Sequence, residues 1–375
     1  MLTWLTSETN PRPVGLARII VGAAAIIRVV IAVPILGKLT EPETLRAPLS
    51  VWFPDPTPAL VASVMVVWFV AAILFMIGWR VSLTGPALLA AIVVVLSLDL
   101  QTYSNHLYLM AWLVLLLTLA DAGAGLSIKR VQRPVVRWTV FLLMMQVSVV
   151  YGFAAITKLS SEFLSGRVLA GALHGGLLSF PDPLRTREFL GAVAIATVFV
   201  ELFLAVFLWS PRFRPTAFIL GLGFHAMIML FMGPTGELFV FALEMLALYP
   251  LFLTQDQLLV IWDDQCASCQ DWIVRFRRMD LLDVLVPIGK TQPEHDIESD
   301  EVERSIHLVH AGETSRGFRA ITRIFEHLVP TLWVAPVFRF PVLSRLGERW
   351  YRWQAARRSC LVGSKSAIGA GPPPG

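Results

Sequence analysis

Long apolar runs without charged residues limit what this chain can fold into. No Asp, Glu, Lys or Arg occurs in residues 81–98, 107–120, 138–157 and 215–233. A helix needs about 20 mainly apolar residues to cross the hydrocarbon core of a bilayer. Because 56% of the residues are hydrophobic and only 15% are charged, lipid must solvate much of the chain. The sequence therefore predicts a polytopic membrane protein.

Eight segments are long and apolar enough to be spanning helices. They lie at about residues 14–36, 58–79, 82–100, 103–120, 137–158, 188–209, 214–233 and 237–254. The first is too long for the apolar region of a signal peptide, so we interpret it as a spanning helix. The apolar, glycine-rich link 159–187 suggests a short interfacial or re-entrant helix. We expect an all-α bundle of about eight spanning helices over residues 1–255.

Basic residues in the short loops predict the orientation of this bundle. They gather on one side of the membrane: Arg80, Lys129, Arg130, Arg133, Arg137, Arg212 and Arg214. The loops on the opposite side are nearly neutral. We therefore expect a multi-pass protein of the plasma membrane with both termini in the cytoplasm. Since this orientation signal explains the net charge of +4, no nucleic acid is expected as a partner.

A different pattern begins after residue 255. Strand-like runs alternate with helix-like stretches, in the order LLVIWD, Cys269–Asp280, LLDVLVPI, the acidic loop 291–304, SIHLVHAG and Phe318–Leu328. This alternation predicts an α/β soluble domain over residues 256–362. The proline-broken segment Val329–Leu346 is interpreted as lying on the surface. Residues 363–375 are expected to form a disordered tail.

Ionisable residues inside spans are costly, so each is a candidate for function. They are Arg28, His106, Lys158, Glu201, His225 and Glu244. The alternative is a structural role, with Arg28 paired to one of the two glutamates. His106 begins the fourth span and Lys158 ends the fifth, both at the predicted outer surface, so they are expected to be able to meet. Tyr151 lies two helical turns before Lys158 on the same face. A buried lysine can act as a general base, or it can simply extend to water.

Three motifs in the bundle resemble a known family. SNHLYL (104–109), YGFAAITKLSSEFLSG (151–166) and GFHAMIMLFM (223–232) are similar to motifs of the vitamin K-dependent gamma-carboxylases and of their bacterial relatives, the horizontally transferred transmembrane (HTTM) domain proteins. The resemblance covers about residues 10–255. The carboxylases carry a further large domain that recognises their protein substrate, and the chain has nothing of that size. Quinol oxidation or another base-driven reaction therefore stays open beside carboxylation.

The resemblance implies a cofactor and roles for several residues. In the carboxylases, a lysine at the position of Lys158 deprotonates reduced vitamin K, and a histidine at the position of His106 assists. A quinol, either menaquinol or vitamin K-like, is thus expected among the helices. The residues expected to contact it are Tyr151, His225, Asn105, Arg28 and Glu201.

The C-terminal part resembles a second family. VIWDDQCASCQDWIVRFRRMD (260–280), followed by FRAITRIFEHL and ERWYRWQAARR, is similar to the DCC family of thiol-disulfide oxidoreductases. The resemblance implies that the α/β domain is thioredoxin-like. That family usually reads Tyr-Asp-Gly-x-Cys-x-x-Cys. Here Trp262 replaces the tyrosine and Asp264 replaces the glycine.

The Cys-x-x-Cys pair itself favours redox chemistry. Cys266 and Cys269 lie at a predicted strand-to-helix junction, where a helix N-terminus stabilises the thiolate of an exposed first cysteine. Asp263 and Asp264 oppose this, because nearby negative charge raises the pKa of a thiol. The alternatives are two inert thiols, or a zinc site completed from Cys360, His295, His307 and His310. Since none of these has a paired metal spacing, no metal is expected.

Together these features suggest a membrane redox enzyme. Its bundle would bind a quinol with Lys158 as base, and its cytoplasmic domain would exchange thiols and disulfides. Because the cysteines and Lys158 are expected on opposite sides, either a diffusing quinone links them or the domains have separate roles. The alternative is a non-catalytic membrane subunit or assembly factor. Expected partners are membrane lipid or quinone, and a thiol protein or a membrane complex.

Overall fold

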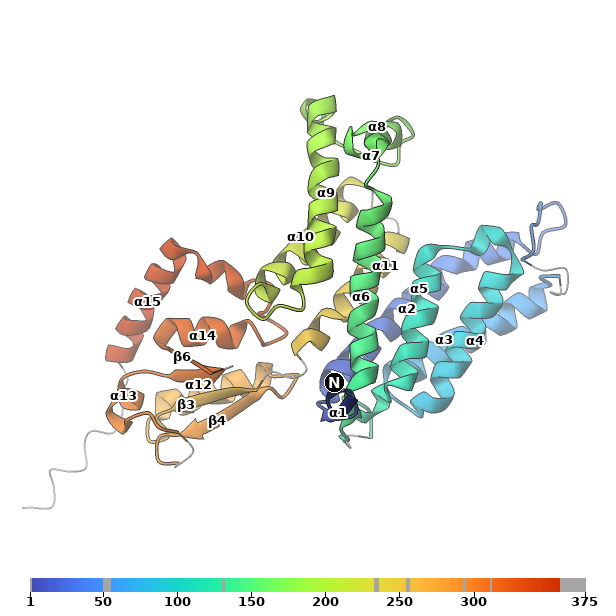
Figure 1. Cartoon of the computed structure of the whole chain (residues 1–375). Coiled ribbons are helices and arrows are strands. Elements are labelled where there is room, and N and C mark those ends of the chain that lie inside the picture. Colours follow the sequence, from blue (N-terminus) through green and yellow to red (C-terminus); the bar gives the residue numbers. More distant parts are fainter. Residues whose placement is uncertain are drawn as a thin grey trace, which may run out of the picture. The chain divides into compact units, whose positions relative to one another are not determined.

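The computed structural model describes residues 2–49, 55–129, 132–232, 236–253, 257–292, 295–310 and 312–357. It divides into two compact units, Met1–Gln255 and Asp256–Gly375, which we describe separately (Figure 1). The expected disordered tail, 363–375, lies outside the described residues.

The N-terminal unit is a bundle of apolar helices. In the described residues, seven are long and apolar enough to cross a membrane, which makes the chain a multi-pass membrane protein and confirms the all-α class. They are α2 (Arg12–Lys38), α3 (Pro58–Met76), α4 (Val81–Leu98), α6 (Arg137–Thr157), α9 (Arg187–Phe207), α10 (Arg214–Phe231) and the run Gly236–Leu253, which joins α11 (Gly236–Ala247) to the 3₁₀ turn Tyr249–Leu253.

The fourth expected span is a shorter helix. α5 (Asn105–Leu119) has 15 residues, and at about 1.5 Å per residue it extends roughly 22 Å. The Ser104 hydroxyl fixes its start by accepting a hydrogen bond from the Leu107 amide. Asp121 turns the chain at its other end with a positive φ of 46°. The apolar run was therefore recognised, but its caps make the helix shorter than a full span.

Small residues let the helices of the bundle approach closely. A Cβ on Gly22 of α2 would lie 2.7 Å from the Cβ of Met76 in α3. A Cβ on Gly85 of α4 would lie 2.0 Å from the Thr118 hydroxyl of α5. These two glycines therefore mark close crossings between neighbouring helices.

Short elements complete the N-terminal unit. α1 (Leu2–Leu5) precedes β1 (Glu8–Thr9), which pairs antiparallel with β2 (Val135–Val136). The link 159–187 holds two short helices, α7 (Ser161–Leu164) and α8 (Arg167–His174). The helical character expected of this link is present, and its location at the membrane interface stays a prediction.

The C-terminal unit is a mixed α/β domain with a four-stranded sheet, as predicted. Its strands β3 (Leu258–Trp262), β4 (Leu285–Gly289), β5 (His307–His310) and β6 (Glu313–Arg316) lie in the order β4-β3-β5-β6. β3 and β4 are parallel, and the other neighbours are antiparallel. The helices are α12 (Ala267–Met279), α13 (Ser299–Arg304), α14 (Gly317–Phe325) and α15 (Pro341–Ala356).

Two expectations for this unit need correction. The segment Val329–Leu346 does not simply lie on the surface, because Leu332 and Ala335 are buried. Pro341, which we treated as a break, instead occupies the first turn of α15, where proline is tolerated since that amide has no helical partner.

Candidate functional site

The two cysteines lie where β3 leads into α12. Cys266 is the N-cap residue of the helix, and its carbonyl accepts hydrogen bonds from the amides of Cys269 and Gln270, both at 3.0 Å. Cys269 therefore lies in the first turn. The expected strand-to-helix junction is present, and both sulfurs lie near the positive end of the helix dipole.

The exposure of the two thiols is the reverse of the sequence expectation. Cys266 is 0% exposed, whereas Cys269 is half-buried and lines a pocket. The turn before the helix accounts for the burial of Cys266. In this turn the Cys266 amide donates a hydrogen bond of 3.2 Å to the Asp263 carbonyl. Its Sγ lies 3.2 Å from the Ser268 hydroxyl.

An ion pair compensates the charge of Asp263 beside this turn. Lys290 Nζ lies 3.0 Å from Asp263 Oδ1 and 2.8 Å from Glu303 Oε1. Burial lowers the pKa of Lys290, but its hydrogen bonds with Glu303 and Asp263 outweigh this and raise the pKa overall. Lys290 is therefore a cation, and it offsets the effect that Asp263 was expected to have on the thiols.

Asp264, which replaces the usual glycine of the motif, also has a partner. Its Oδ2 accepts a hydrogen bond of 2.6 Å from the Thr291 hydroxyl. A Cβ on Gly289 would lie 2.5 Å from the same oxygen. The glycine at the end of β4 thus makes room for the aspartate, which accounts for the departure from the family pattern.

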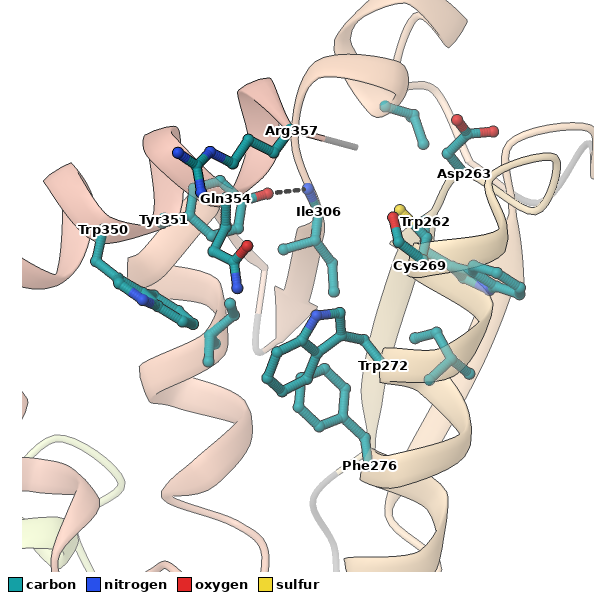
Figure 2. A pocket seen from close by; sticks show the side chains of 14 residues that line it. Trp262, Asp263, Cys269, Trp272, Phe276, Ile306, Trp350, Tyr351, Gln354 and Arg357 are labelled. Atoms are coloured by element: carbon teal, nitrogen blue, oxygen red, sulfur yellow. Dashed lines mark hydrogen bonds between the residues drawn. The ribbon is translucent and has the colours of Figure 1, made fainter. Parts of the chain in front are cut away.

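The pocket beside Cys269 has a volume of about 120 Å³, and most of its lining side chains are apolar, five of them aromatic. Trp272 and Phe276 extend into it from α12, with ring centroids 5.7 Å apart. Tyr351 of α15 faces them and accepts a hydrogen bond of 3.0 Å from the Ile306 amide (Figure 2). Such walls suit an apolar or aromatic group held next to a thiol.

The histidines considered for a zinc site have other surroundings in the structure. Within the described residues, no group of three or more His, Cys, Asp or Glu side chains could hold a metal ion. His310 packs on His327, with centroids 4.9 Å apart. His307 is buried in β5, and burial lowers its pKa. Cys360 lies outside the described residues.

In the bundle, Lys158 pairs with Glu201. Lys158 Nζ donates to both carboxylate oxygens, at 2.7 and 3.0 Å, and to the Ala154 carbonyl at 3.1 Å. The expected meeting with His106 is not seen: among the described residues, no hydrogen bond or ring contact joins the two. The His106 ring instead packs on Phe241 at 4.6 Å between centroids.

A buried hydrogen-bonded triad lies deeper in the bundle. The Tyr151 hydroxyl is 2.8 Å from His225 Nε2 and 2.9 Å from the Tyr249 hydroxyl. The His225 ring contacts Phe241 at 5.4 Å, so Phe241 packs against both histidines. The structure thus brings together Tyr151 and His225, which were both expected at the cofactor, and adds Tyr249.

Arg28 has a different partner from the two that were considered. Its Nη1 lies 2.7 Å from Glu237 Oε1, in the first turn of α11, rather than at Glu201 or Glu244. Glu244 is 0% exposed, and neither of its carboxyl oxygens has a hydrogen-bond partner among the described residues. Asn105 is exposed and accepts a hydrogen bond from the Tyr103 hydroxyl at 3.2 Å, away from the buried groups.

Comparison with protein families decides the identity of the bundle. The profile of the HTTM domain matches residues 7–257. The chain belongs to the HTTM domain family. Residues 260–364 match the profile of DCC1-like thiol-disulfide oxidoreductases, so an HTTM bundle is fused to a DCC1-like domain. No curated protein and no solved structure matches the chain.

Sequence reasoning missed three residues that organise these sites. In the DCC1-like domain, Lys290 follows β4, and the pairing of Trp262 with Gly289 across parallel strands was the signal that could have placed it beside Asp263. In the HTTM bundle, Glu237 and Tyr249 lie at the two ends of the last span, where polar groups are usually taken to face the membrane surface.

Proposed function

We propose that the DCC1-like domain exchanges disulfides through Cys269 and Cys266. The observation that supports this is the position of Cys269 in the first turn of α12, half-buried and lining the aromatic pocket. Reactive cysteines typically occupy such partly exposed sites near a helix N-terminus. Cys269 is therefore the cysteine that attacks the substrate disulfide, and the buried Cys266 is the one that resolves the mixed disulfide.

The exchange has two steps. The Cys269 thiolate attacks a sulfur of the substrate disulfide, which forms a mixed disulfide and releases one substrate thiolate. Cys266 then attacks the Cys269 sulfur, forming the Cys266–Cys269 disulfide and releasing the second substrate thiol. The substrate gains the two electrons that the cysteine pair loses. We propose a disulfide of a thiol protein or of a membrane complex as this substrate.

Trapping of the mixed disulfide tests the assignment. The full chain is used with Cys360 replaced by Ser, so that only the pair reacts, and glutathione disulfide is the probe. Cys266→Ser should retain glutathione on Cys269, because the resolving thiol is missing, whereas Cys269→Ser should retain little. Equal, negligible labelling of both variants would contradict the proposal and favour a non-catalytic subunit that docks a partner complex.

We also propose that the domain faces the cytoplasm, with both termini on that side. The basic loops support this orientation. In intact cells that express the Cys360→Ser chain, a membrane-impermeant maleimide should label Cys269 only after permeabilisation. Labelling before permeabilisation would invert the proposed topology.

A second proposal concerns the HTTM bundle. We propose that it binds a quinol, menaquinol or vitamin K-like, with Lys158 as the base and His106 assisting. Two polar groups within the spans favour it, the half-buried Lys158–Glu201 pair and the buried triad of Tyr151, His225 and Tyr249, since such groups commonly mark functional sites in membranes. Glu201, whose two carboxylate oxygens accept hydrogen bonds from Lys158 Nζ, is the group placed to take a proton from it.

Epoxide formation tests this second proposal. Purified chain is incubated with reduced menaquinone, oxygen and bicarbonate, and the quinone epoxide is measured by mass spectrometry. Wild-type chain should form epoxide and Lys158→Ala should not, with Arg133→Ala in an exposed loop pair as the control. Equal signals from wild type and Lys158→Ala would remove Lys158 as the base.

A further inference from the structure

The pocket beside Cys269 carries one charge that no described residue neutralises. Two charged side chains line the pocket, Asp263 and Arg357. Asp263 is paired with Lys290 at 3.0 Å, whereas no carboxylate in the described part of the chain pairs with Arg357. The pocket therefore presents a positive charge to the group that occupies it.

An aromatic ring holds this positive charge in place. The guanidinium carbon of Arg357 lies 3.8 Å from the centroid of the Trp353 ring, which is within the range of a cation–π contact. Figure 2 shows Gln354 and Arg357 on one side of the pocket and Cys269 on the other. A ligand that extends across the pocket from Cys269 therefore meets the cation on the far side.

The space between the thiol and this cation suits one apolar side chain. Its main walls are Trp272 and Phe276 of α12 and Trp350 and Tyr351 of α15. A cavity of about 150 Å³ with apolar walls can hold a benzene molecule, and this pocket has a volume of about 120 Å³. One aromatic or branched aliphatic side chain therefore fills it. Gln354, which also lines the pocket, offers an amide that can pair with a peptide group.

We propose that this pocket selects the substrate of the disulfide exchange, a peptide disulfide in which a large apolar side chain neighbours the cysteine and a carboxylate follows. The apolar side chain enters the pocket, and the carboxylate pairs with Arg357. The proposal rests on the proposed function, because the pocket lies beside the reacting sulfurs only if Cys269 is the attacking thiol.

The covalent step is the first step of the exchange described above. The Cys269 thiolate bonds to the peptide sulfur next to the apolar side chain, and the second peptide leaves with the electron pair as a thiolate. No further oxidant is needed, since the peptide disulfide is itself reduced.

The two contacts contribute unequally to the selection. Burial of one large apolar side chain increases affinity about tenfold or more, whereas an ion pair at an exposed guanidinium contributes about fivefold at most. The apolar contact therefore provides most of the preference, and Arg357 discriminates between acidic and neutral peptides.

A comparison of three peptide disulfides tests the inference. The full chain carries Cys266→Ser and Cys360→Ser, so that the adduct stays on Cys269. The probes are symmetric disulfides of acetylated, amidated peptides with the sequences Cys-Phe-Glu, Cys-Gly-Glu and Cys-Phe-Gln. Mass spectrometry measures the rate at which each forms a mixed disulfide. Cys-Phe-Glu should react about tenfold faster than Cys-Gly-Glu and about threefold faster than Cys-Phe-Gln.

Three variants assign the contacts. Arg357→Gln should remove the advantage of Cys-Phe-Glu over Cys-Phe-Gln and keep its advantage over Cys-Gly-Glu. Trp350→Ala should reduce the advantage over Cys-Gly-Glu about threefold, and because Trp350 is 44% exposed, its loss should not unfold the domain. Arg349→Gln is the control, since Arg349 is exposed on the same helix and does not line the pocket, and it should keep both preferences.

The outcomes separate this inference from the proposed function. Equal rates for the three peptides, with glutathione disulfide still reacting at Cys269, would overturn the inference and leave the proposed function intact. If Arg349→Gln lost the preference for the acidic peptide as fully as Arg357→Gln, the effect would be one of general charge, and the role of Arg357 would be overturned. If neither the peptides nor glutathione disulfide reacted at Cys269, the proposed function would fail and this inference with it.

Discussion

Lys290 Nζ lies 3.0 Å from Asp263 Oδ1, with the two side chains only 9% and 4% exposed. Asp263 directly follows β3 and Lys290 directly follows β4, and the parallel pairing of Trp262 with Gly289 brings the two strand ends together. The ion pair therefore connects the sheet to the turn that carries Cys266.

Breaking this pair should destabilise the DCC1-like domain. Lys290→Met leaves the Asp263 carboxylate buried without its cation, and removing one partner of a buried pair costs about 3–5 kcal/mol. Hydrogen exchange of the peptides that cover β3 and β4 measures the loss. The double variant Asp263→Asn with Lys290→Met should regain much of the protection, and equal loss in both variants would show that the charge is not the cause.

Acid should weaken the same domain through His307. Burial lowers the pKa of this histidine below its ordinary value of 6.5, so the folded domain resists its protonation. The contribution of neutral His307 to the free energy of unfolding is complete above pH 6.5. It is lost as the pH falls from that value toward the lower pKa that His307 has in the folded domain. The unfolding midpoint should fall less steeply with decreasing pH in His307→Gln than in the wild type. His174→Gln, at an exposed histidine of α8, should keep the wild-type slope.

Removing the Tyr151 hydroxyl should destabilise the HTTM bundle. Tyr151→Phe takes away the group that joins His225 and Tyr249, and a buried polar group left without its partner costs about 1–3 kcal/mol. Thermal unfolding in detergent should show a lower midpoint. Tyr108→Phe, at an exposed tyrosine, serves as the control, and equal midpoints for the two variants would contradict the account.

Filling a close helix crossing should also be unfavourable. In Gly22→Ala the added Cβ would lie 2.7 Å from the Met76 Cβ, and overpacking costs about 1–3 kcal/mol. In Gly37→Ala on the same helix, no atom of the described part of the chain lies within 4 Å of the new Cβ. The unfolding midpoint should fall in Gly22→Ala and stay unchanged in Gly37→Ala. A lower midpoint in both variants would show that the substitution acts through α2 itself rather than through its packing on α3.

The fold classes of both domains could be predicted from the sequence, because local hydropathy shows which segments can lie in a membrane and which resemble strands. Local hydropathy does not show which distant residues pair. Arg28 was expected at Glu201 or Glu244 and lies at Glu237, since hydropathy gives the depth of a charge and not the rotation of its helix.

The thiol site shows the same limit. The change from the strand-like run LLVIWD to a helix-like stretch predicted the junction that carries Cys266 and Cys269. The exposure of each sulfur depends on the hydrogen-bonded turn at Asp263, which that pattern does not describe. Lys290 was missed because its importance follows from strand register, a property of the folded sheet.

A redox titration of the full chain carrying Cys360→Ser tests the central claim most directly. The chain is equilibrated at a series of glutathione ratios, quenched and alkylated, and the number of alkylated cysteines is read by mass spectrometry. The account predicts that Cys266 and Cys269 lose their alkylation together in one two-electron transition. Two cysteines that stay alkylated at every ratio, or that change independently through separate glutathione adducts, would contradict it.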